Sequence, residues 1–319
     1  MKTTFYTPVQ DLILQVEDLM RKQAHGQNRD LETALDHLLS SGGKRVRPAV
    51  ALLTGGMLGG DPRKLVILAA AIEMLHTATL VHDDLIDGSL LRRGMPTLNA
   101  HWSPAATVLT GDFIFSQAAR LAAETESLPA MKLFAETLAT IVNGEITQLF
   151  ANGGIVSHED YYRRIHAKTA SLFELAAHAA AILSPVGEEK IWAASRYGHE
   201  IGMAFQVIDD ILDFTGEQET VGKPVASDLR QGIITLPVIY YSENHPNDTN
   251  LTAILEKQFN ETVVSRLLTD IRESGAINQA MDEARQFIGR GLEALSTMPT
   301  CVERQALEDL AQYIIQRHL

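Results

Sequence analysis

The sequence predicts an all-α protein: a single large helical bundle domain, residues 1–319, arranged around a central cavity. Alanine and leucine are frequent whereas aromatic residues make up only 6% of the chain, a composition that favours helices over strands. Apolar residues recur at helical spacing, and no segment alternates apolar and polar residues over several strands. The hydrophobic content of 45% is sufficient for a large buried core.

The helices are placed by their start and stop signals. Pro48 suits the first turn of a helix that ends at Gly59-Gly60, and Asp61-Pro62 begins the most apolar helix of the chain. Apolar periodicity supplies the rest. The expected helices are 7–26, 30–40, 48–58, 62–87, 111–124, 133–150, 158–183 and 188–213, then one from 235 and amphipathic packing helices within 246–319.

Three aspartates, Asp83, Asp84 and Asp87, lie at the end of the most apolar helix. Asp83 and Asp87 are four residues apart and therefore share a helix face. Three like charges at a helix C-terminus repel one another and are disfavoured by the helix dipole, so we expect a cation nearby. Clustered carboxylate oxygens suit Mg²⁺, which keeps some waters and binds substrate phosphates.

The same DDxxD pattern recurs at Asp209, Asp210 and Asp213, with Gln206 four residues before Asp210. A single copy of such a pattern also fits a solvated acidic turn. Two copies, each within an apolar helix, favour a site that holds several Mg²⁺ ions.

Basic residues gather in three places. Residues 41–48 combine two glycines, three cations and a helix start, which suits an anion, although a solvated basic turn is the alternative. Arg92 and Arg93 follow the first acidic motif, where they either pair with the aspartates or bind phosphate oxygens. Lys168, before Thr169, lies among alanines and leucines and either reaches solvent or faces a polar cavity.

Charge and composition argue against nucleic-acid-binding, secreted and membrane-spanning proteins. The net charge of −13 argues against a nucleic-acid partner. The single Cys301 rules out an intrachain disulfide, so we expect a cytoplasmic location. The first 20 residues lack the layout of a signal peptide. The apolar run 65–81 is short and contains Glu73, so we expect at most peripheral membrane contact.

These patterns predict a metal-assisted diphosphate chemistry. Two acidic clusters on facing helices would hold Mg²⁺ and a diphosphate, with Arg92, Lys168 and Lys223 around it. A neutralised diphosphate is a good leaving group. The separate basic segment implies a second anionic substrate, and the apolar helices imply an apolar substrate tail.

Six motifs carry a family resemblance because they occur together and in this order: GGKRVRP, HTATLVHDDLID, LRRG, GDF, KT and FQVIDDILDF. Over nearly its whole length the chain resembles the long-chain trans-polyprenyl diphosphate synthases of the isoprenyl diphosphate synthase family. In pattern it is closest to component II of heptaprenyl diphosphate synthases. The resemblance implies the all-α isoprenoid synthase fold and a prenyltransferase. Such an enzyme condenses isopentenyl diphosphate with an allylic diphosphate, farnesyl diphosphate or longer, by ionisation, carbon–carbon bond formation and proton loss.

Carried over motif by motif, the resemblance also implies roles for individual residues. Isopentenyl diphosphate would be bound by Lys44, Arg47 and His76, with Arg93 assisting. The six aspartates would hold Mg²⁺. The allylic diphosphate would be bound by Arg92, Lys168, Thr169, Gln206 and Lys223. The expected catalytic residues are Asp83, Asp84, Asp87, Lys168 and Thr169, the last two also steadying the allylic cation, while the departing diphosphate acts as the base.

Two further features bear on the product and the assembly. In this family bulky side chains just before the first acidic motif stop elongation, whereas Ala78 and Thr79 are small here. We therefore expect a hexa- to octaprenyl product, heptaprenyl favoured, for a quinone side chain such as that of menaquinone. The family often has GKxTLP after its second motif, but Ile233 replaces that lysine. A similar loss in two-component synthases suggests a heteromer with a small unlike subunit as well as the homodimer typical of the family.

Three alternatives are weaker. An HD-type metal phosphohydrolase would use the His82-Asp83 pair but leaves the second DDxxD and residues 42–48 unexplained. A synthase-like subunit that is inactive without a partner conflicts with the intact aspartates and with Lys44, Arg47 and Lys168. A terpene cyclase would need no second anion site.

Overall fold

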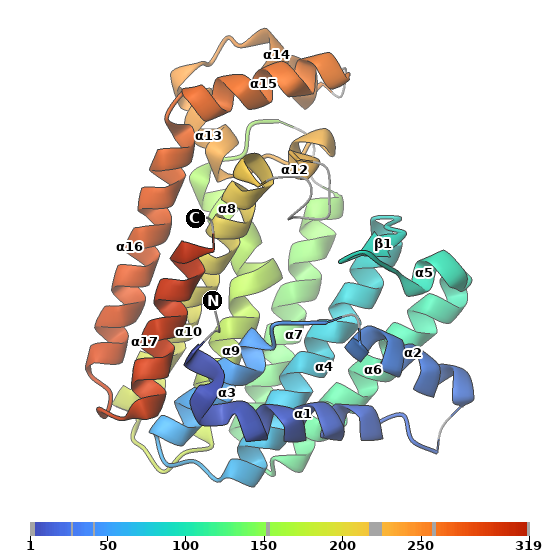
Figure 1. Ribbon diagram of the computed structural model, residues 1–319, viewed down its shortest axis with the longest axis vertical. Coiled ribbons are helices and arrows are strands. Elements are labelled where there is room, and N and C mark those ends of the chain that lie inside the picture. The colour runs from blue at the N-terminus through green and yellow to red at the C-terminus, as the bar shows by residue number, and fades with distance from the viewer. Residues whose placement is uncertain are drawn as a thin grey trace. The chain divides into compact units, whose positions relative to one another are not determined.

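The computed structural model describes residues 4–26, 28–40, 42–150, 154–216, 225–256 and 260–317, and these confirm the all-α prediction (Figure 1). The first half of the chain contains η1 (Thr4–Val9), α1 (Gln10–Lys22), α2 (Arg29–Ser40), α3 (Val46–Met57), α4 (Pro62–Ile86), α5 (Leu98–His101), α6 (Pro104–Glu124) and α7 (Leu128–Leu149).

The second half continues with helices of very different length. They are α8 (His158–Ile165), η2 (His166–Ala170), α9 (Ser171–Ile182), α10 (Glu188–Thr215), α12 (Ser227–Arg230), α13 (Leu236–Asn244), α14 (Thr249–Leu255), α15 (Glu261–Glu273), α16 (Ala276–Ser296) and α17 (Val302–Gln316). Among the described residues the strands are β1 (Leu91–Arg92) and β2 (Met95–Pro96), an antiparallel hairpin with Leu91 opposite Pro96.

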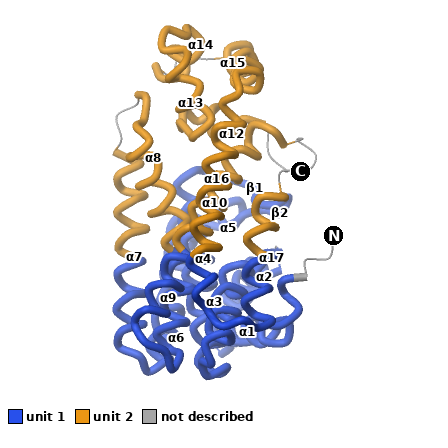
Figure 2. Tube along the Cα trace, turned by 90° about the vertical axis from the view of Figure 1, so that its left-hand side faces the viewer, with its two compact units in different colours: residues 1–137, 172–198, 294–309 blue, residues 138–171, 199–293, 310–319 orange. Residues whose placement is uncertain are grey.

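The chain divides into two compact units (Figure 2). Unit 1 comprises residues 1–137, 172–198 and 294–309, and unit 2 comprises residues 138–171, 199–293 and 310–319. The helices α7, α9, α10, α16 and α17 each have residues in both units. The expectation of a single domain over residues 1–319 stays a prediction.

Helix α4 is the central helix of unit 1. Asp61 caps its N-terminus by accepting a hydrogen bond from the Arg63 N–H at 2.9 Å, and Pro62 occupies the first turn as predicted. It packs beside α6 and also contacts α3 and α1 (Figure 1). By length and composition it is apolar enough to cross a membrane, but 72% of its most apolar window is buried within the structure, as in a core helix.

Three local differences from the sequence prediction have identifiable causes. Helix α6 begins at Pro104 rather than 111, because the Ser103 side chain caps the Ala106 N–H. Helix α7 begins at Leu128 because Ser127 caps it in the same way, through the Ala130 N–H. The expected helix 158–183 contains η2, a π-helical turn that carries Lys168 and Thr169. Such turns are often found at functional sites.

We expect Gly198→Ala to destabilise the protein, because a Cβ at this position of α10 would lie 2.5 Å from the Phe173 carbonyl oxygen. The backbone of α9 cannot move aside without repacking, so a loss of about 1–3 kcal/mol in unfolding free energy is expected. Gly289→Ala in α16 is the matched control: its Cβ meets nothing within 4 Å, and the change should stabilise by about 0.5–1 kcal/mol. Urea denaturation of both variants measures the difference, and equal midpoints would refute it.

Candidate active site

The first acidic motif lies at the C-terminal end of α4 in unit 1. Asp84 is only 5% exposed and is clamped by Arg92 of β1, whose Nε lies 2.9 and 3.0 Å from the two carboxylate oxygens. Asp83 is half-buried and Asp87, the C-cap, is exposed. The pairing of arginine with aspartate therefore occurs at Asp84, and Asp83 and Asp87 are the more accessible carboxylates of the motif.

His82 is directed toward α6. Its Nε2 lies 3.3 Å from the Val108 carbonyl oxygen and 3.5 Å from an Asp112 carboxylate oxygen. A Cβ at Gly111 would lie 2.2 Å from this nitrogen, so the glycine of the GDF motif leaves room for the ring. This position of His82 gives no support to the HD-type phosphohydrolase.

The basic segment divides its cations between two tasks. Arg45 adopts a left-handed backbone conformation and points into unit 1, where it donates to Glu17 at 2.8 Å and Glu73 at 3.1 Å. It also donates to the Leu39 carbonyl oxygen. Because Glu73 is 5% exposed, this buried pair fixes the segment against α4. Arg45, grouped with the other cations in the sequence, is thus committed to structure.

Two of the remaining predicted isopentenyl diphosphate residues, Arg47 and Arg93, lie close enough to His76 to act on its charge. The pKa of His76 lies well below its ordinary value because of burial, followed by the positive charges of Arg47 and Arg93. Arg47 lies over the Phe173 ring at 4.8 Å, and Arg93 donates to the Gly42 carbonyl oxygen. Lys44 is exposed on the same segment. A neutral imidazole among arginines is a hydrogen-bond donor in a positive field, which suits a diphosphate.

In unit 2, the π-helical turn η2 places Lys168 and Thr169 in different surroundings. The Lys168 Nζ donates to the half-buried Glu145 at 2.9 Å, so this lysine faces a polar partner from α7. Thr169 is buried and its hydroxyl donates to the Gln206 Oε1 at 2.6 Å. The structure thus brings Thr169 and Gln206 together.

The second acidic motif in α10 is enclosed by hydrogen bonds. Asp209 forms an ion pair with Arg317 at 2.9 Å. Asp210 is 3% exposed and accepts from Tyr161 at 2.7 Å and from Gln206 at 2.8 Å. Burial, followed by the charge of Asp228, raises the pKa of Asp210 to about 7 although both hydrogen bonds lower it.

Asp213, the last aspartate of this motif, holds the start of α12. Its two carboxylate oxygens accept from the backbone N–H groups of Ser227 and Asp228 at 2.9 and 3.0 Å. Ile233 is half-buried after α12, and its N–H donates to the Asp228 carbonyl oxygen at 2.9 Å. Lys223, the other predicted cation of this region, lies outside the described residues.

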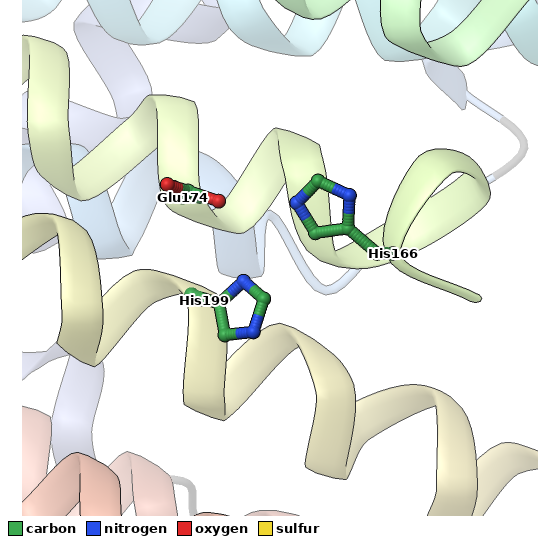
Figure 3. Close-up of side chains that lie close together, drawn as sticks. All are labelled: His166, Glu174 and His199. Atoms are coloured by element: carbon green, nitrogen blue, oxygen red, sulfur yellow. The ribbon is translucent and has the colours of Figure 1, made fainter. Parts of the chain in front are cut away.

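Two histidines accompany η2. The rings of His166 and His199, both in unit 2, lie with their centroids 5.1 Å apart (Figure 3). Sequence reasoning gave them no role. It also missed Tyr161 and Arg317, whose partners are 49 and 108 residues away in the chain, beyond the reach of any local pattern.

The carboxylates fit a divalent cation in donor type and charge. Each motif offers hard oxygen ligands, and each already attracts a positive group: Arg92 at Asp84 and Arg317 at Asp209. Asp83 and Asp87 are the residues of unit 1 that would hold such an ion. In unit 2, Asp209 and Asp213 would do so.

Because Arg45 is buried and Lys44 is exposed, we expect their substitutions to affect different properties: stability for Arg45 and diphosphate binding for Lys44. Arg45→Ala leaves Glu73 buried without its partner, so we expect a loss of about 3 kcal/mol in unfolding free energy. Lys44→Ala removes an exposed charge and should change stability by less than about 0.5 kcal/mol while weakening diphosphate binding. Chemical denaturation and calorimetric titration with inorganic diphosphate separate the two, and a stable Arg45→Ala variant contradicts the assignment.

Comparison with known proteins places these residues in a family. Residues 28–271 match the polyprenyl synthetase family. The chain is 35% identical to the octaprenyl diphosphate synthase of Haemophilus influenzae, covering 88% of this chain and 87% of that one. It is also 35% identical to heptaprenyl diphosphate synthase component 2 of Geobacillus stearothermophilus, covering 98% of both.

Solved structures agree. The polyprenyl synthase from Caulobacter crescentus CB15, complexed with calcium and isoprenyl diphosphate, is 34% identical with a TM-score of 0.93, covering 99% of this chain and 97% of that one. The heptaprenyl diphosphate synthase from Staphylococcus aureus is 32% identical with a TM-score of 0.92, covering 97% and 98%. The all-α fold, the two acidic motifs and the family match agree, so the chain belongs to the polyprenyl synthetase family and is a prenyltransferase.

Proposed function

We propose that the chain is a long-chain all-trans polyprenyl diphosphate synthase that condenses isopentenyl diphosphate with an allylic diphosphate. One observation carries the proposal: unit 1 alone holds two different anion-binding groups. Arg47 and Arg93, with the neutral His76 as a further hydrogen-bond donor, form a positively charged group suited to a bare diphosphate. Asp83 and Asp87 instead suit a diphosphate bound through metal. An enzyme that joins two diphosphate substrates needs both.

The chain's own residues have distinct tasks in this reaction. Arg47 and His76 bind and orient isopentenyl diphosphate. Asp83 and Asp87 in unit 1, and Asp209 and Asp213 in unit 2, are the residues that would hold Mg²⁺. The ion would supply positive charge that neutralises the allylic diphosphate and makes it a better leaving group. Thr169 presents an oxygen atom to the allylic cation while its hydroxyl donates to Gln206. The departing diphosphate accepts the proton lost after carbon–carbon bond formation.

The product proposal rests on Ala78 and Thr79 of α4. Both side chains are small; Ala78 is 2% exposed, and the Thr79 hydroxyl donates to the His76 carbonyl oxygen at 2.8 Å. We propose a hexa- to octaprenyl product, heptaprenyl favoured, that supplies a quinone side chain in the cytoplasm. The relatives are named as heptaprenyl, octaprenyl and nonaprenyl synthases, a range that fits an open product tunnel.

The assembly proposal rests on Ile233. This residue stands where the family often has a lysine, and two relatives are named component 2 of heptaprenyl diphosphate synthase. We propose that the chain acts as the catalytic subunit beside a small unlike subunit, the homodimer being the alternative.

A product assay on the purified chain alone tests the chemistry and the assembly together. Labelled isopentenyl diphosphate, farnesyl diphosphate and Mg²⁺ are supplied, and the dephosphorylated products are sized. A long prenyl product supports the synthase and rejects an obligatory partner. No product from a folded chain that binds both diphosphates supports the heteromer. Farnesol that is released before the dephosphorylation step, without condensation, contradicts the synthase proposal.

Chain-length control is tested at Thr79, which is half-buried. Thr79→Phe should shorten the product below hexaprenyl because the ring blocks growth of the tail, while the first condensation proceeds at a similar rate. Thr79→Ser is the matched control, since it keeps the hydroxyl that donates to His76 and should keep the product length. Thin-layer sizing decides, and an unshortened product from Thr79→Phe rejects the role of this position.

A further inference from the structure

Three consecutive hydrogen bonds in unit 2 run from a buried tyrosine to Thr169. The Tyr161 hydroxyl donates to Asp210 Oδ2 at 2.7 Å, the Gln206 amide nitrogen donates to Asp210 Oδ1 at 2.8 Å, and the Thr169 hydroxyl donates to Gln206 Oε1 at 2.6 Å. All four residues belong to unit 2, and they come from α8, η2 and α10.

The direction of these three hydrogen bonds follows from which groups can donate and which can only accept. Asp210 accepts one hydrogen bond on each carboxylate oxygen, from the Tyr161 hydroxyl on Oδ2 and from the Gln206 amide on Oδ1. Gln206 must therefore turn its NH₂ group toward Asp210, which leaves its carbonyl oxygen facing Thr169. Because that oxygen only accepts, the Thr169 hydroxyl proton is donated to Gln206. The lone pairs of the Thr169 hydroxyl oxygen remain for another partner.

Tyr161, the first donor in this series of hydrogen bonds, is shielded from solvent. Tyr161 is 0% exposed and Asp210 is 3% exposed, so no solvent replaces the hydroxyl if it is removed. A buried carboxylate oxygen without a donor costs the full desolvation of that atom, so the carboxylate rotates toward another donor. That rotation frees the Gln206 amide to turn over and so to reverse the Thr169 hydroxyl.

We propose that Tyr161 is a positioning residue for prenyl transfer: by holding Asp210 it fixes Gln206, and through it the direction of the Thr169 hydroxyl. The inference rests on the proposed function, in which Thr169 faces the allylic group. Thr169 then presents an oxygen lone pair to the electron-deficient carbon instead of a proton, and Tyr161 acts without touching the substrate.

A double-mutant cycle tests the proposal. Tyr161→Phe removes the hydroxyl and keeps the ring, and Thr169→Val removes the end of the chain while keeping the shape. We expect each to lower kcat about tenfold, with the KM of both diphosphates changed less than about twofold. The double variant should lose little more than either single variant, since both remove one coupled chain. Additive losses, or a wild-type kcat in Tyr161→Phe, overturn it.

Tyr241→Phe is the matched control. The Tyr241 hydroxyl also donates to a carboxylate in unit 2, Asp248 at 2.9 Å, and Tyr241 is buried as well. We expect this variant to keep its kcat. If both variants lower kcat equally, the effect is general loss of packing and the assignment fails.

A binding measurement separates this proposal from the proposed function. A thio analogue of farnesyl diphosphate that does not ionise is titrated by calorimetry with Mg²⁺. We expect Tyr161→Phe to bind it within about twofold of wild type, whereas a weakened affinity would make Tyr161 part of metal or diphosphate binding and overturn the positioning role. A wild-type chain that binds the analogue but makes no prenyl bond under any pairing contradicts the proposed function itself.

If Tyr161→Phe does not fold, Gln206→Leu breaks the same chain in the middle at a half-buried position. It should lower kcat about as much as Thr169→Val, again without an additive loss when the two are combined. Additivity here overturns the proposal just as it does for Tyr161.

Discussion

The concentration of carboxylates in two short segments is the constraint on which the described structure depends. Three aspartates within five residues repel one another, so each one that is buried needs a donor from another element. Arg92 of the β1–β2 hairpin donates hydrogen bonds to Asp84, and the Tyr161 hydroxyl of α8 donates one to Asp210. The backbone N–H groups at the start of α12 donate to Asp213. The hairpin, α8 and α12 are thereby each tied to the helix that carries the charge.

Within each motif, the aspartates differ in burial and therefore in role. In both motifs the middle aspartate, Asp84 or Asp210, is the most buried and has both oxygens engaged in hydrogen bonds, so it connects neighbouring elements of the structure. The first aspartates, Asp83 and Asp209, are half-buried and Asp87 is exposed, which leaves these carboxylates accessible to an ion. The same division holds for the cations, because Arg45 binds Glu73 while Lys44 stays exposed.

The sequence predicted the parts of the fold that are encoded locally. The start of α4, the two DDxxD motifs and the basic segment follow from caps, spacing and composition, and the helices were found where periodicity was strong. The missed features depend on distant partners. In the sequence Tyr161 resembles an ordinary core aromatic residue, and only the structure shows its hydrogen bond to Asp210. The role of Arg45 depends on Glu17 and Glu73, each 28 residues away. The π-helical turn η2 consists of HAKTA, ordinary helix residues with no signal of their own.

The ion pair between Asp209 and Arg317 connects the end of the chain to the proposed metal chemistry. Arg317 follows α17, its guanidinium lies over the Phe205 ring at 4.6 Å, and it occupies an oxygen of Asp209 at 2.9 Å. A divalent ion and a guanidinium on one carboxylate repel each other, so Asp209 can serve Mg²⁺ fully only if Arg317 moves to another anion. The diphosphate proposed to accompany the metal is such an anion. In that arrangement the arginine that balances Asp209 without ligand also balances the substrate when it is bound.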